Sequence, residues 1–134
     1  MAKILVIDDD AAARRMISRV LTDAGHQVVS AGDGVEGMRR FRAEAPDLVI
    51  TDIIMPEQEG MQTIAEIRGC GSKVAVIAIS GGGAGAGTLY LSMAEELGAD
   101  AALAKPFRPP ELLALVEQML ARDLLDQGQI AATD

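Results

Sequence analysis

Short apolar runs alternate with longer amphipathic stretches along the whole chain. Most of the runs stop at a polar residue, and short apolar runs are typical of strands buried on both faces of a parallel sheet. The longer stretches repeat apolar residues at intervals of three and four, as a helix with one buried face does. The pattern predicts strands at residues 4–7, 28–29, 48–51, 74–79 and 101–104.

Each predicted strand is followed by a predicted helix. Asp33 and Glu36 have the spacing of a capping box at the start of the second helix, and Pro109 suits the first turn of the last one. Gly25 and Gly98 follow the first and fourth helices, where a glycine can end a helix. The expected helices cover residues 11–24, residues 33 to before Pro46, residues around 61–67 and 89–97, and residues 109 to about 122.

This alternation predicts an α/β fold in which helices cover both faces of a parallel sheet. The first, third and fourth strands are the most apolar and belong in the centre, whereas the second and fifth suit the edges. That favours the strand order 2-1-3-4-5, a flavodoxin-like doubly wound five-stranded sheet with five helices, over the order of dinucleotide-binding folds. We expect one domain over residues 1–122 and a flexible C-terminal tail over residues 123–134, where periodicity is lost.

Composition and charge narrow the range of functions. The 134 residues suit one domain of ordinary size. With 12 Lys and Arg against 20 Asp and Glu, the formal net charge is −8, which would repel a phosphate backbone, so no nucleic acid partner is expected. No apolar run reaches the length of a membrane span and no cleavable signal pattern is visible, so we expect no membrane contact and a cytoplasmic location. The single Cys70 agrees with that compartment.

Polar side chains stand at the carboxyl ends of four predicted strands. Asp8 and Asp9 follow the first strand, Asp52 the third, Ser80 the fourth and Lys105 the fifth. The carboxyl ends of parallel strands share one edge of the sheet, where ligands bind in such folds. Three carboxylates brought together repel one another unless a cation joins them, and an oxygen-rich cluster suits Mg²⁺. A lysine and a hydroxyl beside them could hold a phosphoryl group.

Each of these residues also has an ordinary structural explanation. Residues 8–10 could merely cap the first helix, and Asp52 could be a turn residue. Ser80 could be a loop residue before the glycines that follow it, and Lys105 a solvated charge. Their joint occurrence at four strand ends favours the functional interpretation.

With this pattern the sequence resembles the receiver domain of two-component response regulators over about residues 3–122. The motifs that carry the resemblance are Asp8-Asp9, the segment DIIMPEQEG at residues 52–60, Ser80-Gly81 and Lys105-Pro106-Phe107. The resemblance implies a phosphoacceptor signalling domain and not an enzyme with a separate substrate. Because no output domain fits after residue 122, we expect a stand-alone, single-domain response regulator. Its expected partners are a histidine kinase or a histidine phosphotransfer protein and a downstream protein, reached by protein contacts or in a phosphorelay.

The resemblance also implies roles for individual residues. Asp52 would accept the phosphoryl group, and Ser80 and Lys105 would each contact one of its oxygens. The peptide bond between Lys105 and Pro106 would be cis, a form that only an X-Pro bond adopts readily. The implied Mg²⁺ ligands are Asp9, Asp52 and the backbone carbonyl of Ile54, with Asp8 acting through a water.

The sequence departs from the family pattern near this site. Receiver domains usually carry Tyr or Phe three residues before the lysine, whereas Ala102 stands there and has no side chain that can swing. Glu59 replaces the commoner Asp or Asn before Gly60, which is a mild change. Residues 81–87 are rich in glycine, and we expect phosphorylation to order this loop and to transmit the signal through it.

Two other functions stay open at this point. A small hydrolase resembling haloacid-dehalogenase-type phosphatases would need a second Asp two residues after the nucleophile, where this chain has Ile54. A receiver-like scaffold that no longer takes phosphate would typically have lost an acidic ligand or the lysine, and this chain keeps them all. His26 is expected to be a surface residue and not a metal ligand.

Overall fold

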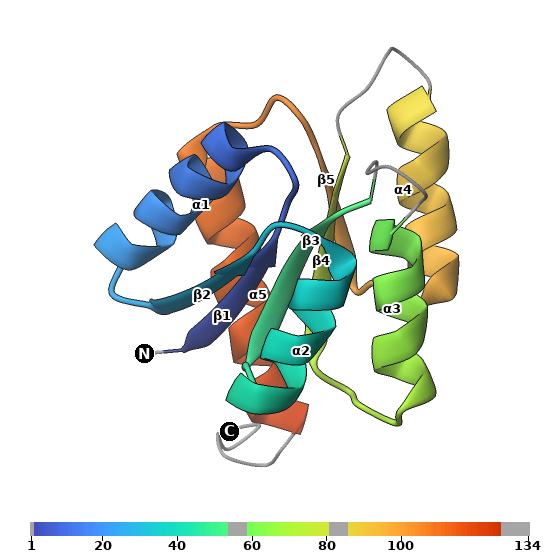
Figure 1. Cartoon of the computed structure of the whole chain (residues 1–134). Coiled ribbons are helices and arrows are strands. Elements are labelled where there is room, and N and C mark those ends of the chain that lie inside the picture. The colour runs from blue at the N-terminus through green and yellow to red at the C-terminus, as the bar shows by residue number, and fades with distance from the viewer. Residues whose placement is uncertain (1, 54–58, 81–85, 127–134) are drawn as a thin grey trace.

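The computed structural model describes residues 2–53, 59–80 and 86–126, and these form one parallel five-stranded sheet between two layers of helices (Figure 1). The strand order is β2-β1-β3-β4-β5, as the sequence predicts. The strands are β1 (Lys3–Ile7), β2 (Gln27–Ala31), β3 (Leu48–Asp52), β4 (Ala75–Ser80) and β5 (Ala101–Ala104).

Helices α1 and α5 cover one face of the sheet, and α2, α3 and α4 cover the other (Figure 1). The helices are α1 (Ala11–Asp23), α2 (Gly34–Glu44), α3 (Glu59–Gly69), α4 (Ala86–Leu97) and α5 (Pro109–Asp126). Each layer encloses its own apolar cluster, one around Ile17 and Val116 and the other around Ile64 and Ala94. Among the described residues, no helix combines the length and the apolar character that crossing a bilayer requires.

The central strands are buried on both faces, which explains why they lack an alternation of apolar and polar residues. Every residue of β3 and β4 is buried, whereas β2 at the edge is partly exposed. Ile7 pairs with Thr51, and Asp52 pairs with Ile79. The carboxyl ends of β1, β3 and β4 therefore lie level at one edge of the sheet.

Two aspartates cap the first two helices. The Asp10 carboxylate accepts hydrogen bonds from the backbone N–H groups of Ala12 and Ala13, and the Asp33 carboxylate accepts one from Glu36 at 2.8 Å. Asp10 thus satisfies the start of α1. The capping explanation that stayed open for residues 8–10 therefore applies to Asp10 and leaves the carboxylates of Asp8 and Asp9 for another role.

Two expectations are wrong in detail. Helix α5 continues to Asp126, beyond its predicted end near residue 122, because Arg122 is paired with Asp123 and with Asp100 instead of facing open solvent. His26 is not a surface residue, since its side chain is only 8% exposed. Its Nε2 lies 2.9 Å from a carboxylate oxygen of Glu117, and its Nδ1 accepts a hydrogen bond from the backbone of Ala2.

Candidate functional site

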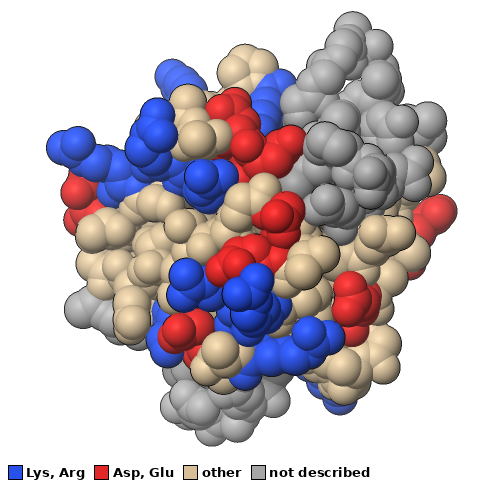
Figure 2. All heavy atoms as spheres, in the orientation of Figure 1, with Lys and Arg blue, Asp and Glu red and all other residues tan. Residues whose placement is uncertain are grey.

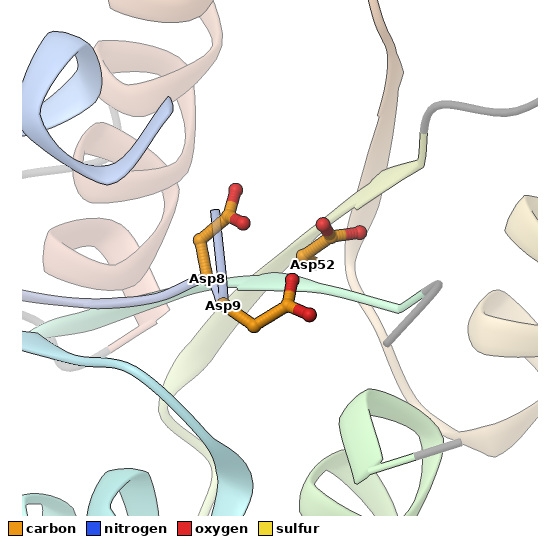
Figure 3. Close-up of side chains that lie close together, drawn as sticks. All are labelled: Asp8, Asp9 and Asp52. Carbon is orange, nitrogen blue, oxygen red and sulfur yellow. The ribbon is translucent and has the colours of Figure 1, made fainter. Parts of the chain in front are cut away.

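Three carboxylates meet at the carboxyl edge of the sheet. Asp8 and Asp9 follow β1, and Asp52 is the last residue of β3. Each offers a carboxylate oxygen, and these oxygens all lie within 4.8 Å of one another. Figure 3 shows the Asp9 and Asp52 carboxylates next to each other, with that of Asp8 beside them. The predicted convergence of these three residues is confirmed.

Two of the three carboxylates are buried. Asp8 is 1% exposed and Asp52 is 5% exposed, whereas Asp9 lies at the surface. A buried carboxylate is costly unless it is paired or hydrogen-bonded. The site must therefore supply positive charge to Asp8 and Asp52, and it leaves Asp9 open to solvent.

Lys105 supplies that charge to both buried carboxylates. Its Nζ lies 3.1 Å from Oδ2 of Asp8 and 3.2 Å from Oδ2 of Asp52. Burial by itself lowers the pKa of Lys105, but the attraction of Asp52 and Asp8 outweighs this and raises the pKa above the usual 10.5. The bond from Lys105 to Pro106 is cis, as expected from the resemblance. One ammonium group thus pairs with two of the three carboxylates.

Asp8 is held at its backbone as well as at its side chain. Its Oδ1 accepts a hydrogen bond from the backbone N–H of Asp10 at 2.9 Å, and its carbonyl oxygen accepts one from Nη1 of Arg14 at 2.6 Å. The contribution of Arg14 is absent from the sequence predictions, because an arginine near the start of an amphipathic helix resembles any solvated charge. The loop that carries the acidic residues is therefore fixed to α1.

The structure describes only some of the other residues that the sequence analysis singled out. Ser80 ends β4 beside Asp52 and is 1% exposed. Ala101 and Leu103 pack with the cluster of α1 and α5, so the methyl group of Ala102 faces the other side of the sheet. The carbonyl of Ile54 and most of the glycine-rich loop, residues 81–85, lie outside the described residues, so their predicted roles stay predictions.

The acidic site lies between basic helix surfaces, although the net charge of the chain is −8. Figure 2 shows Lys and Arg gathered over α1 and over α2, with Asp and Glu between them. On α1, Arg14, Arg15 and Arg19 line a wide open hollow together with hydroxyl side chains. On α2 the basic residues are partly neutralised, since the Glu36 carboxylate lies 2.9 Å from both Arg39 and Arg40.

The donor set fits a hard divalent cation. Carboxylate oxygens are the ligands that Mg²⁺ prefers, and a cation would relieve the repulsion among the three carboxylates. The geometry can therefore hold a divalent ion among the three carboxylates, close to the ammonium group of Lys105. Such an arrangement suits a group that carries negative charge on several oxygens, such as a phosphoryl group.

Comparison with known proteins shows the family of this chain. The family model described as the response regulator receiver domain matches residues 4–117. Among curated proteins, the probable transcriptional regulator ycf27 of Guillardia theta is 39% identical over 120 residues, covering 90% of this chain and 46% of that protein. The response regulator MprA of Mycobacterium ulcerans (strain Agy99) is 32% identical over 134 residues, covering 96% of this chain and 54% of that protein.

A solved structure shows the same likeness in three dimensions. The crystal structure of a response regulator receiver domain protein from Clostridium thermocellum matches with a TM-score of 0.85 and 32% sequence identity, covering 93% of this chain and 98% of that one. The chain belongs to the family of response regulator receiver domains, the signalling domains of two-component systems. It spans about half the length of the curated relatives described above.

Proposed function

We propose that this receiver domain accepts a phosphoryl group on Asp52 from the phosphohistidine of a histidine kinase or a histidine phosphotransfer protein, with Mg²⁺ as cofactor. The observation that carries the proposal is the position of the Asp52 carboxylate. It ends a central strand, lies within 4.8 Å of the carboxylate oxygens of Asp8 and Asp9, and contacts Lys105. No other carboxylate of the described residues combines these neighbours at a strand end.

The chemistry is the transfer of a phosphoryl group between two side chains. A carboxylate oxygen of Asp52 forms the new bond to phosphorus while the bond between phosphorus and the imidazole nitrogen of the donor breaks, and the nitrogen later takes up a proton. Lys105 can offset negative charge on the transferred group, since its ammonium group already faces Asp52 at 3.2 Å. When bound, Mg²⁺ supplies further neutralisation of the phosphoryl oxygens. Asp9 and Asp52 would hold it directly and Asp8 through a water, with the carbonyl of Ile54 as the remaining protein ligand.

Ser80 is proposed to donate a hydrogen bond to another phosphoryl oxygen. It is the last residue of β4, the strand that pairs with β3 on one side and with β5 on the other. Its place between the strands that end in Asp52 and lead to Lys105 supports this role. The aspartyl phosphate is then removed by attack of water on phosphorus, which returns Asp52 to its carboxylate form.

The direct test is phosphorylation by a small phosphodonor. The purified protein is incubated with phosphoramidate and Mg²⁺, and its intact mass is measured. We expect one added phosphoryl group, none after chelation of Mg²⁺, and none on the Asp52→Asn variant. Asp47→Asn is the matched control, because Asp47 flanks the other end of β3, where its Oδ2 accepts a hydrogen bond from the backbone of Lys3. It should be labelled like the wild type.

Two results would overturn the proposal. Normal labelling of Asp52→Asn would mean that another residue is the acceptor, and a wild-type protein that takes no phosphoryl group from any donor would make the domain a scaffold.

We further propose that the domain acts as a stand-alone module. An immunoblot of the native protein tests this, since the band should match the mass of the 134-residue chain.

A further inference from the structure

The first turn of α3 lies directly on the backbone of Asp52. Gly60, near the start of this helix, is buried. A Cβ atom at position 60 would overlap the carbonyl oxygen of Asp52, and it would lie 2.6 Å from Cα of Ile53 and 2.9 Å from the carbonyl carbon of Asp52. All three are backbone atoms, so none of them can turn aside as the end of a side chain can.

The backbone of residues 52 and 53, which Gly60 contacts, is also held by hydrogen bonds. The N–H of Ile53 donates a hydrogen bond to the carbonyl of Ile79 in β4 at 2.9 Å, and the Thr51 hydroxyl lies 3.1 Å from the Asp52 carbonyl oxygen. The Ile53 side chain is 1% exposed and belongs to the apolar cluster that includes Ile64 of α3. A side chain at position 60 would therefore force α3 out of its core packing or rotate the peptide that follows Asp52.

We propose that Gly60 is a positioning residue for the phosphoacceptor. The absence of a side chain lets α3 begin against the Asp52 backbone, and this contact sets the direction of the Asp52 carboxylate relative to Asp9 and Lys105. The inference rests on the proposed function of Asp52. It assigns Gly60 no contact with the transferred group, and its effect on the reaction passes through the orientation of the acceptor.

Two other glycines serve as matched controls. A Cβ on Gly37 of α2 would lie 2.5 Å from Cδ1 of Ile7, which is the movable end of a side chain. Gly37→Ala should therefore destabilise the core without turning the acceptor. Gly69, at the other end of α3, has nothing within 4 Å of its Cβ position. Gly69→Ala should leave the site intact and should not lower the stability, because alanine favours a helix more than glycine does.

The experiment measures three quantities on each variant: the rate of phosphorylation by phosphoramidate, the dissociation constant for Mg²⁺, and stability to urea. We expect Gly60→Ala to lose about 10- to 100-fold in rate, because a small misplacement of a reacting group has effects of that order. It should also bind Mg²⁺ more weakly at a temperature where it is folded. Gly37→Ala should lose stability but keep both the rate and the Mg²⁺ affinity, a separation that a purely structural role of Gly60 would not produce.

Several outcomes would overturn the inference. One is a Gly60→Ala variant with the wild-type rate and Mg²⁺ affinity. Another is a loss of rate that only follows the loss of folded protein, as judged against Gly37→Ala. If Gly60→Ala is largely unfolded, both variants are measured again in sucrose, which strengthens burial, and a restored rate would contradict the inference. If the wild type takes no phosphoryl group, the proposed function fails, while the Mg²⁺ affinities still decide the role of Gly60.

Discussion

The carboxyl and amino edges of the sheet carry charge clusters of different balance. At the carboxyl edge, the carboxylates of Asp8, Asp9 and Asp52 lie together, and one ammonium group, that of Lys105, pairs with two of them. At the amino edge, two guanidinium groups share the carboxylate of Asp100, and the carboxylate of Asp123 lies beside one of them, that of Arg122. Asp100 lies 2.8 Å from Nη2 of Arg68 and 3.1 Å from Nη2 of Arg122.

The amino-end cluster, formed by Arg68, Asp100 and Arg122, has most of its hydrogen bonds satisfied within the protein. Oδ2 of Asp100 also accepts a hydrogen bond from the backbone N–H of Val76 at 2.9 Å. Arg68 donates further hydrogen bonds to the carbonyl oxygens of Gly98, Ser72 and Val74. This cluster joins α3, α5 and the starts of two strands. The carboxyl-end cluster lacks positive charge by comparison, so its stability depends on what binds there.

The largest expected effect lies at the amino-end cluster. Asp100→Ala should leave the guanidinium groups of Arg68 and Arg122 and the N–H of Val76 without their shared acceptor. Breaking a buried pair costs about 3–5 kcal/mol, and the Asp100 side chain is 22% exposed, so we expect a loss of about 2–3 kcal/mol in the free energy of unfolding by urea. Phosphorylation of the folded protein should stay unchanged.

A surface ion pair provides the control for this measurement. Asp23 lies 3.6 Å from Arg19 and is largely exposed, so Asp23→Ala should change the free energy of unfolding by less than about 0.5 kcal/mol. If the two alanine variants lose the same amount, the contrast between a structural cluster and an ordinary surface pair is wrong.

The second effect concerns the carboxyl-end cluster. The change in the free energy of unfolding caused by Asp9→Asn should have opposite signs with and without Mg²⁺. Mg²⁺ at a concentration of 100 times its dissociation constant should raise the free energy of unfolding by about 2.7 kcal/mol, because it binds only the folded cluster. Asp9→Asn should lose most of that gain. Without metal the same variant should be more stable than the wild type, by about 0.5 kcal/mol, because it removes one of three like charges.

Urea titrations in Mg²⁺ and in a chelator check both halves of this prediction. Asp33→Asn is the matched control, since Asp33 caps α2 away from the site and Asn caps a helix as well as Asp does. It should respond to Mg²⁺ like the wild type. An Asp9→Asn variant that is less stable than the wild type in the chelator would mean that the three carboxylates do not strain the metal-free fold.

The smallest effect is the response of the metal-free protein to alkaline pH. The pKa of Lys105 is higher in the folded state than its usual 10.5, so its attraction to Asp52 and Asp8 contributes fully below pH 10.5. The contribution is lost as the pH rises through the raised pKa. In chelator, the stability of Lys105→Gln should fall less than that of the wild type between pH 9 and 11.5 (roughly the range spanned by this titration).

Lys3→Gln is the control, because it removes an ion pair with Glu44 at the opposite end of the sheet. It should keep the alkaline fall of the wild type. Equal slopes for the wild type and Lys105→Gln would show that the attraction of Lys105 to the two carboxylates adds nothing to the stability of the fold.

The contrast between the two clusters also explains what the sequence could predict. Residues of the carboxyl-end cluster follow the apolar strands directly, so strand order alone brings Asp8, Asp52 and Lys105 together. The members of the amino-end cluster come from the end of one helix, the start of a strand and the end of another helix. No local pattern marks Arg68 or Arg122, because each resembles a solvated charge on an amphipathic helix.

The ends of strands and helices are also hard to predict from the sequence pattern. The edge strand β2 runs over Gln27–Ala31, although only its two valines form an apolar run, because backbone pairing with β1 includes the polar residues on either side. Helix α5 passes its predicted end because Arg122 is held by Asp100, a contact distant in sequence. His26 is half-buried and contacts Glu117 of α5, a partner that no residue near it in the sequence indicates. Tertiary contacts determine the extent of β2, the end of α5 and the position of His26, and the spacing of apolar residues along the chain does not indicate these contacts.

The complete burial of β3 has a consequence for the register of this strand in the sheet. In a strand with one solvent-exposed face, the alternation of apolar and polar residues fixes the register, because a shift by one residue would turn the apolar side chains toward solvent. β3 is buried throughout, so its apolar residues alone would tolerate such a shift. Its acidic residues would not, because sliding one way draws Asp47 into the sheet, and sliding the other way moves Asp52, already the last residue of the strand, away from Lys105 and deeper among apolar neighbours. The proposed acceptor of the phosphoryl group therefore also marks where its own strand must stop.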